Sequence, residues 1–156
     1  MLEIRQATAA DAGLLTAHRK AMFLAMGHAD DASIETMSRS FEPWVRRLIG
    51  ADKYLAWVAE DVGHPVASAG LLILDWPPQP LDPAGEHRGY LFNVFVEQDY
   101  RRRGIAKSLV ERCMIEARRR SIRVVVLHAS NAGAPMYEAL GFGATNEMLH
   151  VEPAET

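Results

Sequence analysis

Residues 90–110, YLFNVFVEQDYRRRGIAKSLV, constrain the fold of this chain more than any other segment. The first seven are almost all apolar and predict a β-strand, and apolar positions at helical spacing predict a helix at the end. Between them stand Arg101, Arg102 and Arg103, followed by Gly104. Because a helix N-terminus carries partial positive charge, three cations there are unfavourable unless an anion binds. The segment therefore predicts a strand, an anion-binding turn and a helix.

The turn has the features of a phosphate site. The free N–H groups of a first helical turn point outward, and glycine lets a ligand approach the backbone closely. Arginine adds charge-assisted hydrogen bonds to phosphate oxygens. The P-loop pattern fails, because Arg101 and Ala106 stand where its glycines belong, and the dinucleotide pattern G-x-G-x-x-G is absent. What matches is [QR]-x-x-G-x-[GA], over residues 101–106.

Composition places the chain among ordinary globular domains. Its 156 residues, 49% of them apolar, predict one domain over residues 1–156. No apolar run is long enough for a membrane span, and no basic head precedes an apolar leader. With Cys113 as its one cysteine, the chain is expected in the cytoplasm. The net charge of −3, and the few aromatic residues among the arginines, do not favour nucleic-acid binding.

The remaining segments predict a mixed α/β sheet. Strands are expected at residues 2–8, 54–60, 65–76, 90–96, 122–127 and within 143–151, with helices at about 14–26, 33–49, from 105 and around 135. We expect Pro43 to interrupt the second helix. Residues 77–89 contain four of the eight prolines and predict a loop. The almost wholly apolar strand 122–127 is expected in the buried middle of the sheet.

Three stretches, NVFVEQDYRRRGIAKSLV, VVVLHAS and PMYEALGF, together resemble the GCN5-related N-acetyltransferase (GNAT) superfamily over residues 53–150. The resemblance implies a single α/β domain whose mixed, mostly antiparallel sheet contains a splayed pair of parallel strands and is flanked by helices. It implies direct transfer of acetyl from acetyl-CoA to a primary amine of a small molecule or a peptide. No group of His, Cys and Asp residues has metal-ligand spacing, so no metal is expected. A catalytically weak acyl-CoA-binding sensor is the alternative, and a homodimer stays open.

The resemblance also assigns cofactor-binding residues. Phe95 and Val96 would bond the pantetheine arm in the manner of a neighbouring strand. Asn131, near the start of the last helix, would reach the cofactor. The backbone amides that would hold the pyrophosphate belong to Arg101, Arg102, Arg103, Gly104, Ile105 and Ala106.

Catalysis would depend on Tyr137, which many relatives aim at the thioester sulfur. A phenol pKa of about 10 and a thiol pKa of about 8.5 allow proton donation once thiolate forms. A core tyrosine is the structural alternative. Tyr90, Asn93 and Trp44 are expected to bind the acceptor amine.

The general base stays open. The strand before the loop offers none, and His128, at the end of an apolar strand, is expected to be a core histidine. Glu97 follows the strand and is expected to face solvent. An ordered water could relay the proton, or the amine could arrive neutral.

Overall fold

Five strands form one mixed sheet in the computed structural model, which describes residues 1–155. Their spatial order follows the sequence: β1 (Leu2–Gln6), β2 (Tyr54–Asp61), β3 (His64–Asp75), β4 (His87–Val96) and β5 (Val125–Leu127). The first four pair antiparallel, and β5 runs parallel to β4. The helices are α1 (Ala12–Met26), α2 (Asp31–Gly50), α3 (Ile105–Arg119) and α4 (Ala134–Ala139). The mixed, mostly antiparallel α/β fold predicted from the sequence is confirmed.

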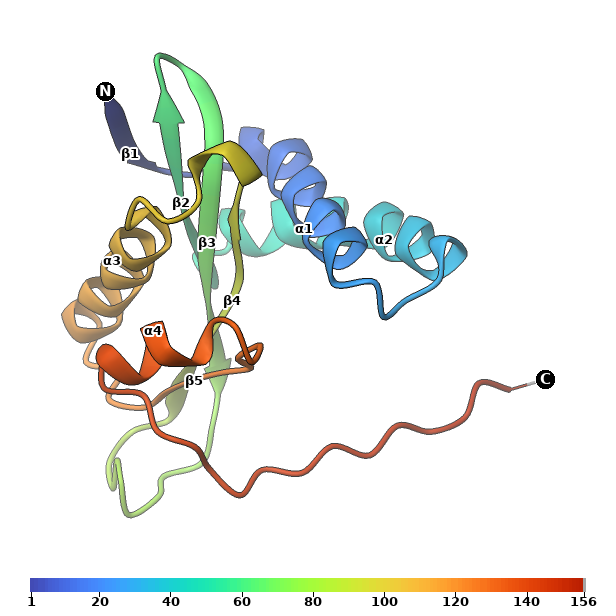
Figure 1. Cartoon of the computed structure of the whole chain (residues 1–156). Helices are drawn as coiled ribbons and strands as arrows, with labels where there is room; N and C mark the ends of the chain where they lie inside the picture. Colours follow the sequence, from blue (N-terminus) through green and yellow to red (C-terminus); the bar gives the residue numbers. More distant parts are fainter. Residues whose placement is uncertain (156) are drawn as a thin grey trace.

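The helices cover both faces of the sheet, α1 and α2 on one and α3 and α4 on the other (Figure 1). Because side chains alternate along a strand, β2 contributes to two apolar cores. Leu55 and Trp57 belong to the core that contains Leu109 of α3. Tyr54 and Ala56 belong to the second core, together with buried residues of α1 and α2: Ala12, Leu15, Phe41 and Val45. No helix of residues 1–155 is both long and apolar enough to cross a bilayer.

Helix α2 corrects one prediction from the sequence. It runs without interruption through Pro43, although proline lacks the N–H that would bond the carbonyl of Arg39. Both residues are exposed, so water can reach the carbonyl that proline leaves unpaired. The apolar face of α2, which buries Ile34, Phe41 and Val45, keeps the helix continuous.

The C-terminal part of the sheet departs further from prediction. No strand forms within residues 143–151, and the segment after α4 leads away from the domain (Figure 1). Its described contacts include an ion pair between Arg88 and Glu147 at 2.8 Å. As a result β5 is an edge strand of three residues, not the middle strand that its apolar sequence indicated. His128, directly after β5, is exposed and is not a core histidine.

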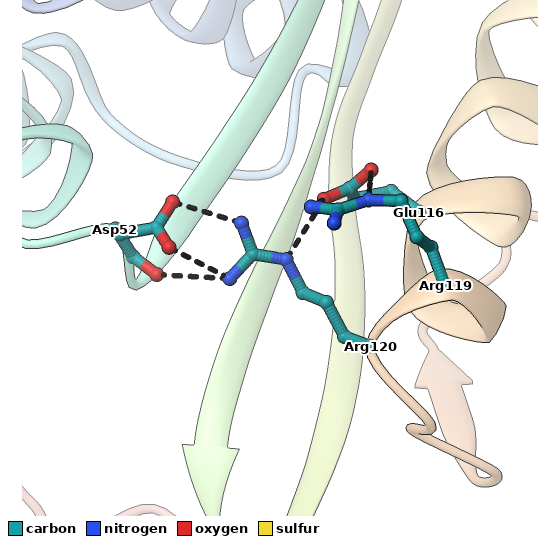
Figure 2. Close-up of polar contacts among 4 residues, drawn as sticks. All are labelled: Asp52, Glu116, Arg119 and Arg120. Carbon is teal, nitrogen blue, oxygen red and sulfur yellow. Dashed lines mark hydrogen bonds and ion pairs between the residues drawn. The ribbon is translucent and has the colours of Figure 1, made fainter.

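An ion-pair network joins the end of α3 to the turn before β2 (Figure 2). Arg120, just beyond α3, contacts Glu116 of the helix and Asp52 of the turn. Arg119 contacts the same glutamate. These contacts lie on the side of the domain where α3 packs over the sheet, and they hold the helix end against β2.

Candidate active site

Strands β4 and β5 pair along only part of their length. Gly89, Tyr90 and Leu91 stand opposite Val125, Val126 and Leu127, and the parallel pairing ends there. Beyond Leu91, β4 continues for five residues to Val96 without β5 beside it. The splayed parallel pair that the resemblance implied is therefore present, and it leaves the second half of β4 open on one edge.

A β-bulge reshapes β4 at the point where the two strands part. Gly70 of β3 stands opposite Phe92, whereas Ser68 stands opposite Phe95, so β4 carries one extra residue in this interval. Asn93 takes a left-handed conformation, with φ of 58°. Asparagine tolerates this conformation better than most residues. The bulge turns Phe92 and Asn93 toward the same face of the sheet, where both contact Tyr54.

A groove of about 280 Å³ lies beside the open half of β4. It is lined by Met22, Ala25 and Met26 of α1, by Val94, Phe95 and Val96 of β4, and by Arg101 and Ser130. Three of the residues predicted to bind cofactor thus line one groove, namely Phe95, Val96 and Arg101. The Arg101 side chain donates from Nε to the Val96 carbonyl at 3.0 Å, which fixes the arginine at the groove edge.

The turn before α3 presents unpaired backbone N–H groups. Ser108 is the first residue whose N–H bonds within this helix, to the Gly104 carbonyl at 3.1 Å. The N–H groups of the three residues before it have no partner inside the helix. Gly104 has φ of 77°, and a side chain added there would meet no atom within 4 Å. The Ile105 side chain is buried in the core, so only its backbone is available to a ligand.

Two predicted cofactor residues have their side chains placed elsewhere. Arg103 donates to the Asp99 carbonyl at 2.9 Å and lies over the Tyr100 ring, so its side chain braces the preceding turn. Asn131 is exposed and does not cap α4. The Ser130 hydroxyl accepts from the N–H of Gly133, the N-cap residue of α4, at 3.2 Å, and so stabilises the turn that precedes the helix.

Tyr137 lies on α4, half-buried against the core that α3 shares with the sheet. Its ring makes an edge contact with Phe142, with 5.9 Å between centroids. Burial raises the pKa of the Tyr137 hydroxyl above its ordinary value, so the phenol is protonated at neutral pH. The Tyr137 hydroxyl makes no hydrogen bond to any of residues 1–155. Tyr137 is also not among the residues that line the groove beside β4. Both the role as an acid and the role as a core residue stay predictions.

The predicted acceptor residues lie together on the α1/α2 face of the sheet. Phe92 links two of them, with ring centroids 6.4 Å from Trp44 and 5.9 Å from Tyr90. Asn93 is adjacent, and its Nδ2 donates to the Tyr54 hydroxyl at 3.1 Å. The structure thus brings all three predicted residues to one aromatic cluster next to the strand splay.

Arg19 was not identified from the sequence, yet it is part of this cluster. Its Nη1 donates to Oδ1 of Asn93 at 2.5 Å. The sequence did contain a sign of it, because Arg19 is a cation within the apolar stripe that includes Leu15, Met22 and Met26.

Titratable side chains near the groove are few. His18 is buried on α1, with Nδ1 2.7 Å from the Ser68 hydroxyl and its ring 4.9 Å from that of Phe95. Burial lowers the pKa of His18, so its imidazole is neutral at pH 7. Glu97 lies beyond β4 and approaches His64 at 3.4 Å. Within residues 1–155, no three His, Cys, Asp or Glu side chains are grouped closely enough to hold a metal ion.

Two human N-acetyltransferases are similar in sequence to part of this chain. A human protein, N-acetyltransferase 8, is 33% identical over 94 residues, which are 58% of this chain and 39% of that protein. The chain spans about two fifths of the length of the two human relatives that it matches.

Two crystal structures match over almost the whole chain. A GCN5-related N-acetyltransferase from Ralstonia eutropha JMP134 has a TM-score of 0.92 and 34% identity, covering 97% of this chain and 99% of that one. A predicted acetyltransferase from Clostridium acetobutylicum, crystallised with acetyl-CoA, has a TM-score of 0.89 and 27% identity, covering 97% and 96%.

A sequence model of the acetyltransferase (GNAT) family matches residues 19–142, which span the groove, the arginine turn and Tyr137. The match includes every element that builds the splay between β4 and β5. The chain belongs to the acetyltransferase (GNAT) family.

Proposed function

We propose that this protein transfers an acetyl group from acetyl-CoA directly to a primary amine. The observation that carries the proposal is the juxtaposition of an open strand edge with unpaired N–H groups at the start of α3. An extended amide-containing ligand can pair with such an edge, and a diphosphate can bind such a helix terminus.

The residues of the groove fit acetyl-CoA. The first-turn N–H groups of α3 and the Arg101 guanidinium would hold the diphosphate, and the space beside Gly104 is open. The backbone at Phe95 and Val96 would bond the pantetheine amides. When bound, acetyl-CoA supplies a thioester with a reactive carbonyl carbon and a thiol leaving group.

The protein would contribute an acid and an acceptor site to the reaction. The protonated Tyr137 hydroxyl would donate its proton to the departing sulfur. The aromatic cluster around Trp44, Tyr90 and Asn93 would hold the amine near the splay. The attacking amine is neutral, and it loses one further proton as the C–N bond forms and the C–S bond breaks. An ordered water would carry that proton away, and the Tyr137 phenolate would regain a proton from solvent.

The acceptor class that we propose is a small-molecule or peptide amine. We further propose that the protein works in the cytoplasm, without nucleic acid or a membrane, and a homodimer is compatible with this function. A protein that binds acyl-CoA as a sensor is the second candidate, since the open half of β4 carries no carboxylate or imidazole side chain between Phe92 and Val96.

The decisive experiment is a screen of amine acceptors with acetyl-CoA, monitored by release of free thiol and by mass spectrometry of the product. A transferase releases CoA in an amount equal to the acetylated amine. A protein that binds acetyl-CoA but releases thiol no faster than the buffer, with every amine and peptide, is the sensor.

A further inference from the structure

Arg19 is a partly buried cation without an anionic partner in residues 1–155. Its guanidinium carbon lies 4.9, 5.0 and 5.6 Å from the ring centres of Phe23, Phe41 and Phe92. Nε is closed to solvent and has no hydrogen-bond partner within residues 1–155. Nη2 also has no hydrogen-bond partner within residues 1–155, but it is accessible to solvent. Of the nitrogens in this side chain, only Nη1 is bonded, to Asn93.

Each of the other partly buried arginines has an anionic partner, although Nε of Arg88 is also closed to solvent and without a hydrogen-bond partner in residues 1–155. Arg5, Arg88 and Arg120 each contact a carboxylate oxygen at 2.8 Å. Arg19 is in no ion pair of the described residues, whereas its neighbour Lys20 pairs with Glu35. Cation–π contacts offset part of the cost of desolvating a guanidinium, but they supply no hydrogen bonds to Nε and Nη2. The protein therefore leaves this charge uncompensated.

The position of Arg19 connects it to the groove. It precedes Met22, a groove residue, by three positions and therefore lies on the same face of α1. Its bonded partner Asn93 and its stacked partner Phe92 are the first residues of β4 beyond the pairing with β5. Arg19 thus lies where the open strand edge begins, among the aromatic residues that we assign to the acceptor.

We propose that Arg19 binds an oxyanion, a carboxylate or a phosphate, that the acceptor carries, so that the substrate is an amine with an anionic group. This inference rests on the proposed function, because it assigns a partner within the acceptor site. Nη2, which solvent reaches, can donate a charge-assisted hydrogen bond to an oxygen of either group. An uncompensated charge kept at a site, at a cost to stability, is expected where the ligand completes the pair.

The test compares amines that differ in one anionic group. A set of amino acids is compared with their carboxamides, and O-phosphoethanolamine with ethanolamine. Each probe is titrated calorimetrically into protein saturated with CoA, and is also offered with acetyl-CoA for thiol release. The proteins are the wild type, Arg19→Met, Arg19→Lys and the control Lys20→Met, which removes a neighbouring cation that already has a partner.

We expect the wild type to bind the anionic member of one probe family about 10–100-fold more tightly than its neutral partner. Arg19→Met should bring this ratio to about one while acetyl-CoA affinity stays within about threefold of the wild type. Arg19→Lys should retain part of the preference, and Lys20→Met all of it. The family that shows the preference distinguishes a carboxylate from a phosphate.

Stability provides a second measurement. Arg19→Met removes a desolvated charge but leaves Oδ1 of the buried Asn93 without its donor, so the two effects oppose each other and Tm should stay within about 4 °C of the wild type. A lower melting temperature combined with an unchanged anion preference would make Arg19 a structural residue and overturn the inference. So would a wild type without any anion preference.

The two proposals fail in different ways. Anion preference in binding without thiol release disproves the transferase and leaves the Arg19 site in place. Thiol release with equal use of anionic and neutral amines disproves the Arg19 site and leaves the transferase.

Discussion

Two nitrogens of Arg120 donate to the two carboxylate oxygens of Asp52, Nη1 at 2.9 Å and Nη2 at 2.8 Å, while its Nε donates to Glu116 at 2.8 Å (Figure 2). Hydrogen bonds from Arg119 and Arg120 lower the pKa of Glu116 to about 2, against the opposing effect of burial. The Arg120 bonds also lower the pKa of Asp52. One arginine therefore connects α3 to the sheet through two ionised carboxylates.

This network predicts a pH-dependent contribution to stability. Because both carboxylate pKa values are lower in the folded protein, the contribution is complete above the ordinary carboxylate range, around pH 4.5, and is lost as the pH falls toward 2. We expect Arg120→Ala to lower Tm by about 2–4 °C at pH 7, and the difference to shrink below about pH 4. Thermal melts between pH 7 and pH 2 measure it. Arg112→Ala, an exposed change on the same helix, should show no such trend.

Acetyl-CoA should stabilise the folded protein if the groove binds it. At about 100 times its dissociation constant, a ligand that binds only the native state adds about 2.7 kcal/mol. For a chain of this size that corresponds to an increase in Tm of about 5–10 °C. Free acetate, which lacks the diphosphate, should have no effect in the same melts. An unchanged Tm with both acetyl-CoA and CoA would contradict the proposed groove.

Gly104→Val tests the anion-binding turn. The valine side chain would occupy open space that we assign to the diphosphate, so the dissociation constant for acetyl-CoA should rise by more than about tenfold. Gly63→Val is the matched control, since Gly63 also has positive φ and open surroundings but lies in the turn between β2 and β3. Both variants lose stability from the strained backbone. Equal loss of affinity in both would contradict the assignment of the turn.

Tyr137→Phe separates catalysis from packing. The ring and its contact with Phe142 remain, so stability and acetyl-CoA affinity should change little. Loss of the proton donor should lower kcat by about 10²–10⁴-fold, and by less with thioesters of more acidic thiols. Tyr100→Phe is the control, because it removes a hydroxyl that donates to Asp61 at 2.6 Å outside the groove. Turnover within about threefold of the wild type would show that Tyr137 is a structural residue.

Gly70→Ala tests the support beneath the bulge. A Cβ on Gly70 would lie 1.8 Å from the hydroxyl oxygen of Tyr54, which is fully buried and holds Asn93. Overpacking of this kind costs about 1–3 kcal/mol, or more, and should lower Tm accordingly. Gly50→Ala, at the end of α2 with no atom near the added Cβ, should leave Tm unchanged or slightly higher. If Gly70→Ala is equally harmless, the Tyr54 ring is not confined as the structure indicates.

Local patterns in the sequence were sufficient to predict most of the helices and strands and the turn before α3. Gly27 ends α1 and Gly104 precedes α3, and both glycines have a left-handed backbone conformation. Helix ends of this kind can be predicted because they depend on a few neighbouring residues. The motif from Arg101 to Ala106 likewise predicted a helix terminus with free N–H groups. Phe95 and Val96 were assigned to the cofactor by the resemblance to the GNAT superfamily, and in the structure both line the groove.

Tertiary contacts decided the rest. Pro43 stays helical because packing of the apolar face of α2 outweighs one lost hydrogen bond. Residues 143–151 were predicted to contain a strand, but a strand forms only by pairing, and this segment does not pair with the free edge of β5. The one-residue bulge at Asn93 follows from the register between β3 and β4, which no local pattern encodes. Arg19 could be understood only when three rings and an amide, distant in sequence, were seen around it, because the cost of an unpaired charge depends on what surrounds it.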